Sequence, residues 1–151
     1  MNRKLKFRVI GYGAPMMEVD SLIFNTSVGI VATTKEGEFR LNDKGVHLMQ
    51  YTGYKDYNGK EIYEGDIVEV VWWFEPKTRE QTKQELIINR GGVLKDRWAI
   101  INIHDNGIFY TPVFPELDDN HDDEETNFDE FMAKSSEVIG NIYENPELIE
   151  P

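Results

Sequence analysis

The sequence predicts a mostly β fold, in the form of a small barrel or a rolled sheet. Its apolar residues gather in short runs, some of which alternate with polar residues as half-buried strands do. Glycine and asparagine separate many of these runs, and both residues favour tight turns. The 151 residues, 40% of them hydrophobic, suffice for one domain or for two small subdomains that share a core.

The first third of the chain is predicted to form short strands. Residues 5–10 alternate apolar and basic side chains, and the Gly-Tyr-Gly-Ala-Pro sequence that follows ends this strand. Further strands are expected at residues 16–24, 29–32, 38–41 and 46–51.

The middle of the chain carries the strongest turn signals. Asn58-Gly59 suits the positive φ angles of a two-residue hairpin turn. Residues 64–66 form another turn, which leads into a strand at residues 67–74. One face of that strand should be core, and it consists of Val68, Val70, Trp72 and Phe74.

The rest of the chain is predicted from the same kinds of signal. Residues 75–83 are polar and should form a loop. Strands are expected at residues 84–89, 97–103, 107–114 and 137–143. The acidic stretch 115–127 lacks periodicity and is predicted to be a loop. Helical structure is expected as one turn at residues 128–133 and as a short terminal helix at 145–148, capped by Asn145.

The charge of the chain is unevenly distributed. Residues 1–115 hold 15 acidic and 15 basic side chains, whereas residues 116–151 hold 13 acidic side chains and one basic side chain, Lys134. The net charge of −12 disfavours binding to phosphate backbones, so nucleic acid is not the expected partner.

The composition also predicts the compartment. No apolar run approaches 18 residues, so we expect no membrane span. The basic start is not followed by a long apolar stretch, so we expect no secretory signal. The absence of cysteine excludes disulfides, thiolate metal sites and a cysteine nucleophile, and it fits a cytoplasmic protein.

No motif of a well-marked enzyme class is present. The sequence lacks a phosphate-binding glycine loop, a Gly-x-Ser-x-Gly elbow and a dinucleotide fingerprint. His104 beside Asp105 is either a proton-handling pair or an ordinary turn, and we favour the turn. We therefore expect a protein that is not an enzyme and that uses no cofactor.

One acidic segment partly matches a calcium-binding loop. Its alternating oxygen donors are Asp118, Asn120, Asp122 and Glu124, with Asp129 at the twelfth position. However, Asp123 stands where such a loop needs glycine, and Glu125 stands where it needs an apolar residue. We favour a solvated acidic loop over weak divalent metal binding by these residues.

Two groups of residues are candidates for interaction. On an alternating strand Lys4, Lys6 and Arg8 share one face, which could contact nucleic acid, pair with the acidic residues 116–130, or protect a sheet edge. The edge role is favoured. Trp73 points away from the face of Trp72, and if exposed beside Tyr63 it could anchor a partner or a sister subunit. Burial of Trp73 under residues 1–45 is the favoured alternative.

Three segments resemble the YopX family, a group of proteins encoded by bacteriophages and prophages of low-GC Gram-positive bacteria. They are the opening RKLKFR at residues 3–8, the signature LMQYTGYKDYNGKEIYEGDIV at 48–68, and the ending VIGNIYENPEL at 138–148. Two features depart from the family: Val9-Ile10 replaces a usual tryptophan, and the signature has aromatic residues at Tyr54 and Tyr57.

The resemblance implies a mostly β protein whose main part is a small SH3-like barrel, and it implies no established activity. We expect residues 1–53 to form an N-terminal β segment. Residues 54–151 would form the barrel, with the acidic loop 115–127 and a short C-terminal helical turn. Within the signature, Gly65 should permit a turn and Asp66 should bond nearby backbone amides.

The resulting expectation is a non-enzymatic phage or prophage accessory protein. It would act in the bacterial cytoplasm through contacts with a host or phage protein, as a homo-oligomer. The alternatives are nucleic-acid binding through the basic strand, mimicry of DNA by the acidic residues 116–130, and a metal-dependent enzyme built on the same acidic loop.

Overall fold

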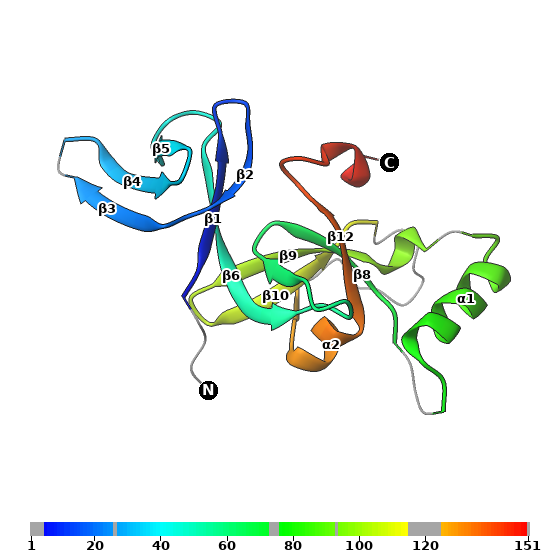
Figure 1. The fold of residues 1–151 in the computed structure, drawn as a ribbon. Helices are drawn as coiled ribbons and strands as arrows, with labels where there is room; N and C mark the ends of the chain where they lie inside the picture. Colours follow the sequence, from blue (N-terminus) through cyan, green and yellow to red (C-terminus); the bar gives the residue numbers. More distant parts are fainter. Residues whose placement is uncertain (1–4, 26, 73–75, 93, 115–124, 151) are drawn as a thin grey trace. The chain divides into compact units, whose positions relative to one another are not determined.

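The computed structural model describes residues 5–25, 27–72, 76–92, 94–114 and 125–150 (Figure 1). Most of its regular structure is strand, which confirms the predicted mostly β class. The chain divides into two compact units, Met1–Tyr51 and Thr52–Pro151. No helix among the described residues is long and apolar enough to cross a membrane.

The first unit consists of short antiparallel strands around its own core. Strand β1 pairs with β2 on one side and with β6 on the other, and β3, β4 and β5 form a separate three-stranded sheet. The core residues are Val9, Ala32, Phe39 and Val46. The strands are β1 (Phe7–Gly11), β2 (Ala14–Glu18), β3 (Ser21–Asn25), β4 (Gly29–Thr34), β5 (Gly37–Arg40) and β6 (His47–Lys55), the last of which continues into the second unit.

The second unit is built on a five-stranded antiparallel sheet with the order β11-β10-β9-β8-β12. Strands β8, β9, β10 and β12 of this sheet are labelled in Figure 1. The strands of this sheet are β8 (Asp66–Val70), β9 (Trp98–His104), β10 (Gly107–Pro112), β11 (Thr126–Asn127) and β12 (Ser136–Asn141). Strand β7 (Glu61–Tyr63) is outside it and pairs with β6. The helical segments of the unit are α1 (Arg79–Asn89), α2 (Glu130–Lys134) and the 3₁₀ turns Lys95–Arg97 and Pro146–Ile149. The buried residues Ile62, Val68, Ile101 and Phe128 are part of its core. The description of this sheet as SH3-like stays a prediction.

The predicted strand at residues 84–89 is wrong, because this segment belongs to helix α1. The helix begins one residue after Thr78, whose hydroxyl accepts a hydrogen bond from the Gln81 amide at 3.2 Å. The Gln81 side chain accepts one from the Thr78 amide at 2.9 Å. This capping box satisfies two backbone donors at the helix start, so the segment predicted as a polar loop already contains the first turn of α1.

The strand predicted at residues 67–74 ends at Val70 and is buried on both faces. Ile67, Val68 and Val71 are fully buried. The prediction placed one face in the core, but all five residues of β8 are buried, so its side chains are covered on both faces. Trp73 and Phe74 lie outside the described residues.

Two predicted local features also differ. Gly59 has a positive φ of 82°, but Asn58 does not, so the turn is not the two-residue type with positive φ at both positions. Asn145 precedes the terminal 3₁₀ turn, but its side-chain oxygen accepts a hydrogen bond from the Asn141 amide instead of capping that turn. Pro146 occupies the first position of the turn, as predicted.

Candidate interaction surfaces and a buried charge network

Buried polar side chains shape the turns of the second unit. Asp66 is 1% exposed, and its carboxylate accepts a hydrogen bond from the Tyr63 amide at 2.8 Å. Gly65, at φ 83°, supplies the left-handed conformation that this turn requires. The predicted structural role of Gly65 and Asp66 is therefore confirmed.

Asp56 joins the 56–60 turn to strand β12. One carboxylate oxygen accepts hydrogen bonds from the amides of Asn58 and Lys60, both at 2.9 Å, and the other accepts from the Val138 amide at 2.9 Å. The side chain is 5% exposed. Because three backbone donors depend on this single carboxylate, the turn is organised by Asp56 and not by positive φ angles at the Asn-Gly pair.

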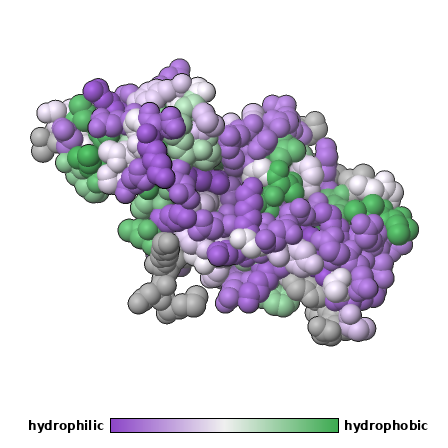
Figure 2. Space-filling view, viewed as in Figure 1, coloured by the Kyte–Doolittle hydropathy of each residue, from purple (hydrophilic) through white to green (hydrophobic). Residues whose placement is uncertain are grey.

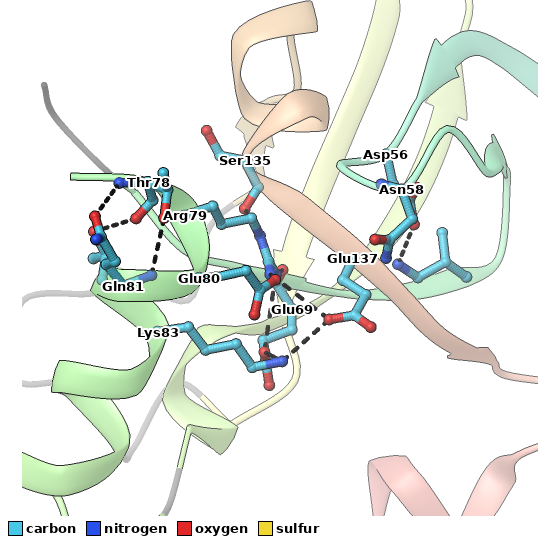
Figure 3. A network of polar contacts seen from close by, with 12 residues as sticks. Asp56, Asn58, Glu69, Thr78, Arg79, Glu80, Gln81, Lys83, Ser135 and Glu137 are labelled. Atoms are coloured by element: carbon cyan, nitrogen blue, oxygen red, sulfur yellow. Dashed lines mark hydrogen bonds and ion pairs between the residues drawn. The ribbon is translucent and has the colours of Figure 1, made fainter. Parts of the chain in front are cut away.

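Arg79, in the first turn of α1, is completely buried (Figure 3). Its Nε donates to the carbonyl of Ser135 at 3.0 Å, and one terminal nitrogen donates to the carbonyl of Glu69 at 3.3 Å. The guanidinium also lies 5.2 Å from the ring centroid of Tyr57. These contacts fasten the start of α1 to strand β8 and to Ser135, the residue just before β12.

Lys83 extends the same network one turn further along α1. Its Nζ lies 2.9 Å from a Glu69 carboxylate oxygen and 3.1 Å from one of Glu137 (Figure 3). Partial burial alone would lower the pKa of Lys83, but the hydrogen bonds to the two carboxylates outweigh it and raise that pKa above its ordinary value. Trp98 donates to the other oxygen of Glu69 at 3.2 Å. The charges in this network are therefore engaged in holding α1 to the sheet.

Two stacked aromatic side chains of the second unit lie next to a small cavity, and one of them, Trp72, lines it. Phe131 is 51% exposed and stacks on Trp72, with ring centroids 5.2 Å apart and an interplanar angle of 26°. A cavity of about 40 Å³ adjoins Trp72. Its other lining residues include Trp98, Tyr110, Pro112 and Met132, with Asp96 and Arg97 as the charged members. We call Trp72, Phe131 and this cavity the aromatic surface.

Strand β3 carries exposed apolar side chains in the first unit. Phe24 is 77% exposed and Ile23 is 46% exposed, and Figure 2 shows apolar surface in this region. Leu22, the residue before them in β3, packs against the buried cluster of the unit. Large apolar side chains that stay this exposed are frequent at protein-binding surfaces.

The predicted edge role of the basic face is wrong, because β1 pairs with β2 on one side and with β6 on the other and so is not an edge strand. Lys6 forms an ion pair with Glu18 at 3.3 Å, and Arg8 lies opposite Glu18 in the register of β1 and β2. Lys4 lies outside the described residues. Tyr12, just after β1, is engaged within the unit: its hydroxyl donates to Asp43 at 2.5 Å and its ring stacks on that of Phe39. The bond to Asp43 raises the pKa of Tyr12.

The remaining candidates are placed as follows. Tyr63 is only 5% exposed, so it does not offer the exposed anchor that the sequence suggested beside Trp73. His104 pairs with Glu125, at 2.9 Å, and not with its neighbour Asp105.

The calcium-like pattern is also only partly visible. Its candidate ligands Asp118, Asn120, Asp122 and Glu124 lie outside the described residues. Asp129, the twelfth residue of that pattern, accepts a hydrogen bond from the Met132 amide at 2.8 Å and so caps α2.

These features define the class of protein. It is a mostly β chain of two small units, and its described buried charges make structural contacts. The crystal structure of protein EF1440 from Enterococcus faecalis is similar over 99% of this chain and 100% of that chain, with a TM-score of 0.63 and 23% identity. The X-ray crystal structure of protein yopX from Bacillus subtilis is similar over 97% and 96%, with a TM-score of 0.47 and 19% identity. Among curated protein sequences, none matches this chain.

The family model described as YopX protein matches residues 6–150. The chain therefore belongs to the YopX family, and the resemblance in its signature segments is confirmed. At 23% identity, the likeness to the Enterococcus faecalis protein shows a shared fold alone.

Sequence reasoning identified parts of this arrangement and missed others. It missed the buried Arg79 and its carboxylate partners, because they come from segments far apart in the chain. The Thr78-x-x-Gln81 pattern was a usable signal for the helix that carries Arg79. It also missed Phe131 as an exposed aromatic residue, since exposure depends on which face of α2 the sheet covers.

Proposed function

We propose that this protein is a phage or prophage accessory protein that binds another protein in the bacterial cytoplasm and catalyses no reaction. The observation that carries the proposal is the aromatic surface, in which Phe131 stays half exposed on Trp72 next to a cavity. Aromatic side chains at the centre of an interface often dominate binding energy. A cavity of about 40 Å³ has room for the end of one side chain of a partner.

The excess of acidic side chains in the second unit supports the proposal that the partner is basic. Residues 52–151 carry 23 acidic and nine basic side chains. Such a field attracts positively charged segments and speeds their association. The proposed partner is therefore a protein segment that inserts one apolar side chain beside Phe131 and carries lysine or arginine on either side of it.

The charged side chains that form structural contacts in the second unit support a role without catalysis. Arg79, Lys83 and Glu69 contact one another or nearby backbone, and Asp56 and Asp66 bond turn amides. Catalytic acids and bases are instead directed toward a substrate in a cleft.

The test is an affinity capture from nuclease-treated lysate of a Gram-positive host, with the full chain as bait. We expect a discrete protein that elutes at rising salt, and we expect Phe131→Ala to lower its recovery at least about tenfold, as loss of an aromatic anchor does. Ile88→Ala is the matched control, because Ile88 is 76% exposed in the same unit but lies on α1.

Three results would contradict the proposal. They are no captured protein, equal capture by wild type and Phe131→Ala, or equal loss with Ile88→Ala. Recovery of nucleic acid with steep salt dependence in a sample without nuclease would instead favour the nucleic-acid alternative through Lys4, Lys6 and Arg8. Circular dichroism of each variant separates lost binding from lost folding.

A further inference from the structure

Strand β3 is an edge strand without the usual protection. It pairs with β4 on one side, and within the described residues no strand lies along its other side. Its sequence, Ser21-Leu22-Ile23-Phe24-Asn25, contains no charge and no proline. Edge strands usually carry charges or proline because an open edge otherwise pairs with another chain.

The opposite edge of the same sheet shows the contrast. Strand β5 carries Glu38 and Arg40, both exposed, and contributes Phe39 to the core. One edge strand of the sheet, β5, therefore carries charged side chains. The other edge strand, β3, carries none and exposes Ile23 and Phe24. This difference identifies β3 as the edge suited to pairing.

The sequence of β3 is complementary to itself in an antiparallel arrangement. If two copies meet across a twofold axis at Ile23, each Ile23 faces its equivalent in the other copy. Leu22 then faces Phe24, and Ser21 faces Asn25, so apolar residues meet apolar residues and polar residues meet polar ones. Such cross-strand pairs stabilise sheets, and a twofold interface requires this self-complementarity.

The charge of the first unit permits this approach. Residues 1–51 carry seven basic and five acidic side chains, close to neutral, whereas residues 52–151 carry 23 acidic and nine basic ones. Two copies repel each other through their acidic units, but little through their first units.

We propose that two copies of this protein associate by antiparallel pairing of β3 with β3, which joins two three-stranded sheets into one of six strands. The inference rests on the proposed function only in that the protein acts through protein contacts, and it concerns a different surface from that of Phe131. A variant that loses the other partner therefore leaves the dimer unchanged.

The test uses charge at the twofold position. We expect the wild-type protein to have twice the mass of one chain in light scattering and sedimentation. Ile23→Lys and Ile23→Glu should each dissociate at least about tenfold more readily, because like charges then face each other across the axis. An equimolar mixture of the two variants should restore the dimer. Arg40→Glu, on the other edge, is the control and should leave the mass unchanged.

A second variant keeps the test decisive if a charge at this position prevents folding. The chain has no cysteine, so Ile23→Cys introduces one thiol that faces its equivalent across the axis. Mild oxidation should then give a disulfide-linked dimer at low protein concentration, whereas Glu38→Cys should not.

The possible failures are distinct. A wild-type protein that stays monomeric, a dimer indifferent to charge at Ile23, or oxidation equal in the two cysteine variants would overturn the β3 interface. Loss of captured protein with Phe131→Ala at an unchanged mass would affect only the proposed partner surface. Unchanged capture by Ile23→Lys would show that the two surfaces act separately.

Discussion

In two turns of this protein, buried carboxylates accept hydrogen bonds from backbone amides. Asp56 accepts from the amides of Asn58, Lys60 and Val138, Asp66 accepts from the amide of Tyr63, and both carboxylates are buried. An unpaired buried amide costs roughly 1–3 kcal/mol, so each of these side chains matters more than an exposed acid. These two acidic residues of the signature segment therefore have a structural role in the turns.

We predict that Asp56→Asn lowers the free energy of unfolding by about 1–3 kcal/mol, the usual cost of leaving a buried donor unsatisfied. The asparagine has the same shape, but its amide nitrogen must face a backbone N–H that now receives no acceptor. Urea denaturation measures the change, and Asp105→Asn in an exposed turn is the control. Equal stability of the two variants would show that the three hydrogen bonds contribute little.

The attachment of α1 illustrates how an element depends on a few contacts at one end. Arg79 and Lys83 reach Glu69, and Arg79 is the buried residue of the helix. The other end exposes Ile88 to 76%, and Figure 2 shows apolar surface over this helix. The first turns of α1 should therefore be stable, and the end of the helix should exchange its amides faster.

The raised pKa of Lys83 predicts a dependence on alkaline pH. A lysine whose pKa is higher in the folded state stabilises the protein fully below its unfolded pKa of 10.5, and that stabilisation is lost as pH rises through the folded pKa. We expect Lys83→Met to be less stable at pH 8 by about 0.5–1 kcal/mol, as a partly exposed ion pair would give. The difference from wild type should shrink above pH 10.5.

The comparison with Lys83→Met is needed because tyrosines titrate in the same range. The hydrogen bond to Asp43 raises the pKa of Tyr12, and burial raises that of Tyr143. Both tyrosines therefore also lose stabilisation at high pH. Urea denaturation of both proteins between pH 8 and about pH 12 separates the contributions. A difference that stays constant over this range would contradict a stabilising charge on Lys83.

At the scale of the molecule, the described residues form two buried clusters that follow one another in the sequence and have no member in common. The first unit packs around Val9 and Phe39, and the second packs around Ile62 and Ile101. Strand β6 runs from one unit into the other. Small cores of this size are individually marginal, so each is sensitive to the loss of a single side chain.

We predict that Val9→Ala and Ile101→Ala destabilise different parts of the chain. Each removes a fully buried side chain and should cost about 2–4 kcal/mol in its own unit. Native-state hydrogen exchange should show faster exchange in residues 5–51 for the first variant and in residues 52–150 for the second. If either variant weakens protection equally throughout, the two cores unfold as one cooperative unit.

The local patterns were sufficient for most of the strands and for the family. Alternation and turn residues placed β1, β9, β10 and β12 within a few residues, because these signals depend only on neighbours in the chain. The signature at residues 48–68 led to the YopX family, which the family model confirms over residues 6–150. Leu86-Ile87-Ile88 was misread as part of a strand, since a short apolar run suits either structure and the cap at Thr78 decided it.

The sequence alone established the mostly β class, the family and the structural purpose of Gly65 and Asp66, because each follows from residues close together in the chain. Burial and exposure were decided by the folded structure. Tyr63 became buried, Phe24 and Phe131 stayed exposed, and Arg79 acquired carboxylate partners from two distant strands. The physical reason is that burial depends on packing between segments far apart in the sequence, which no local pattern records.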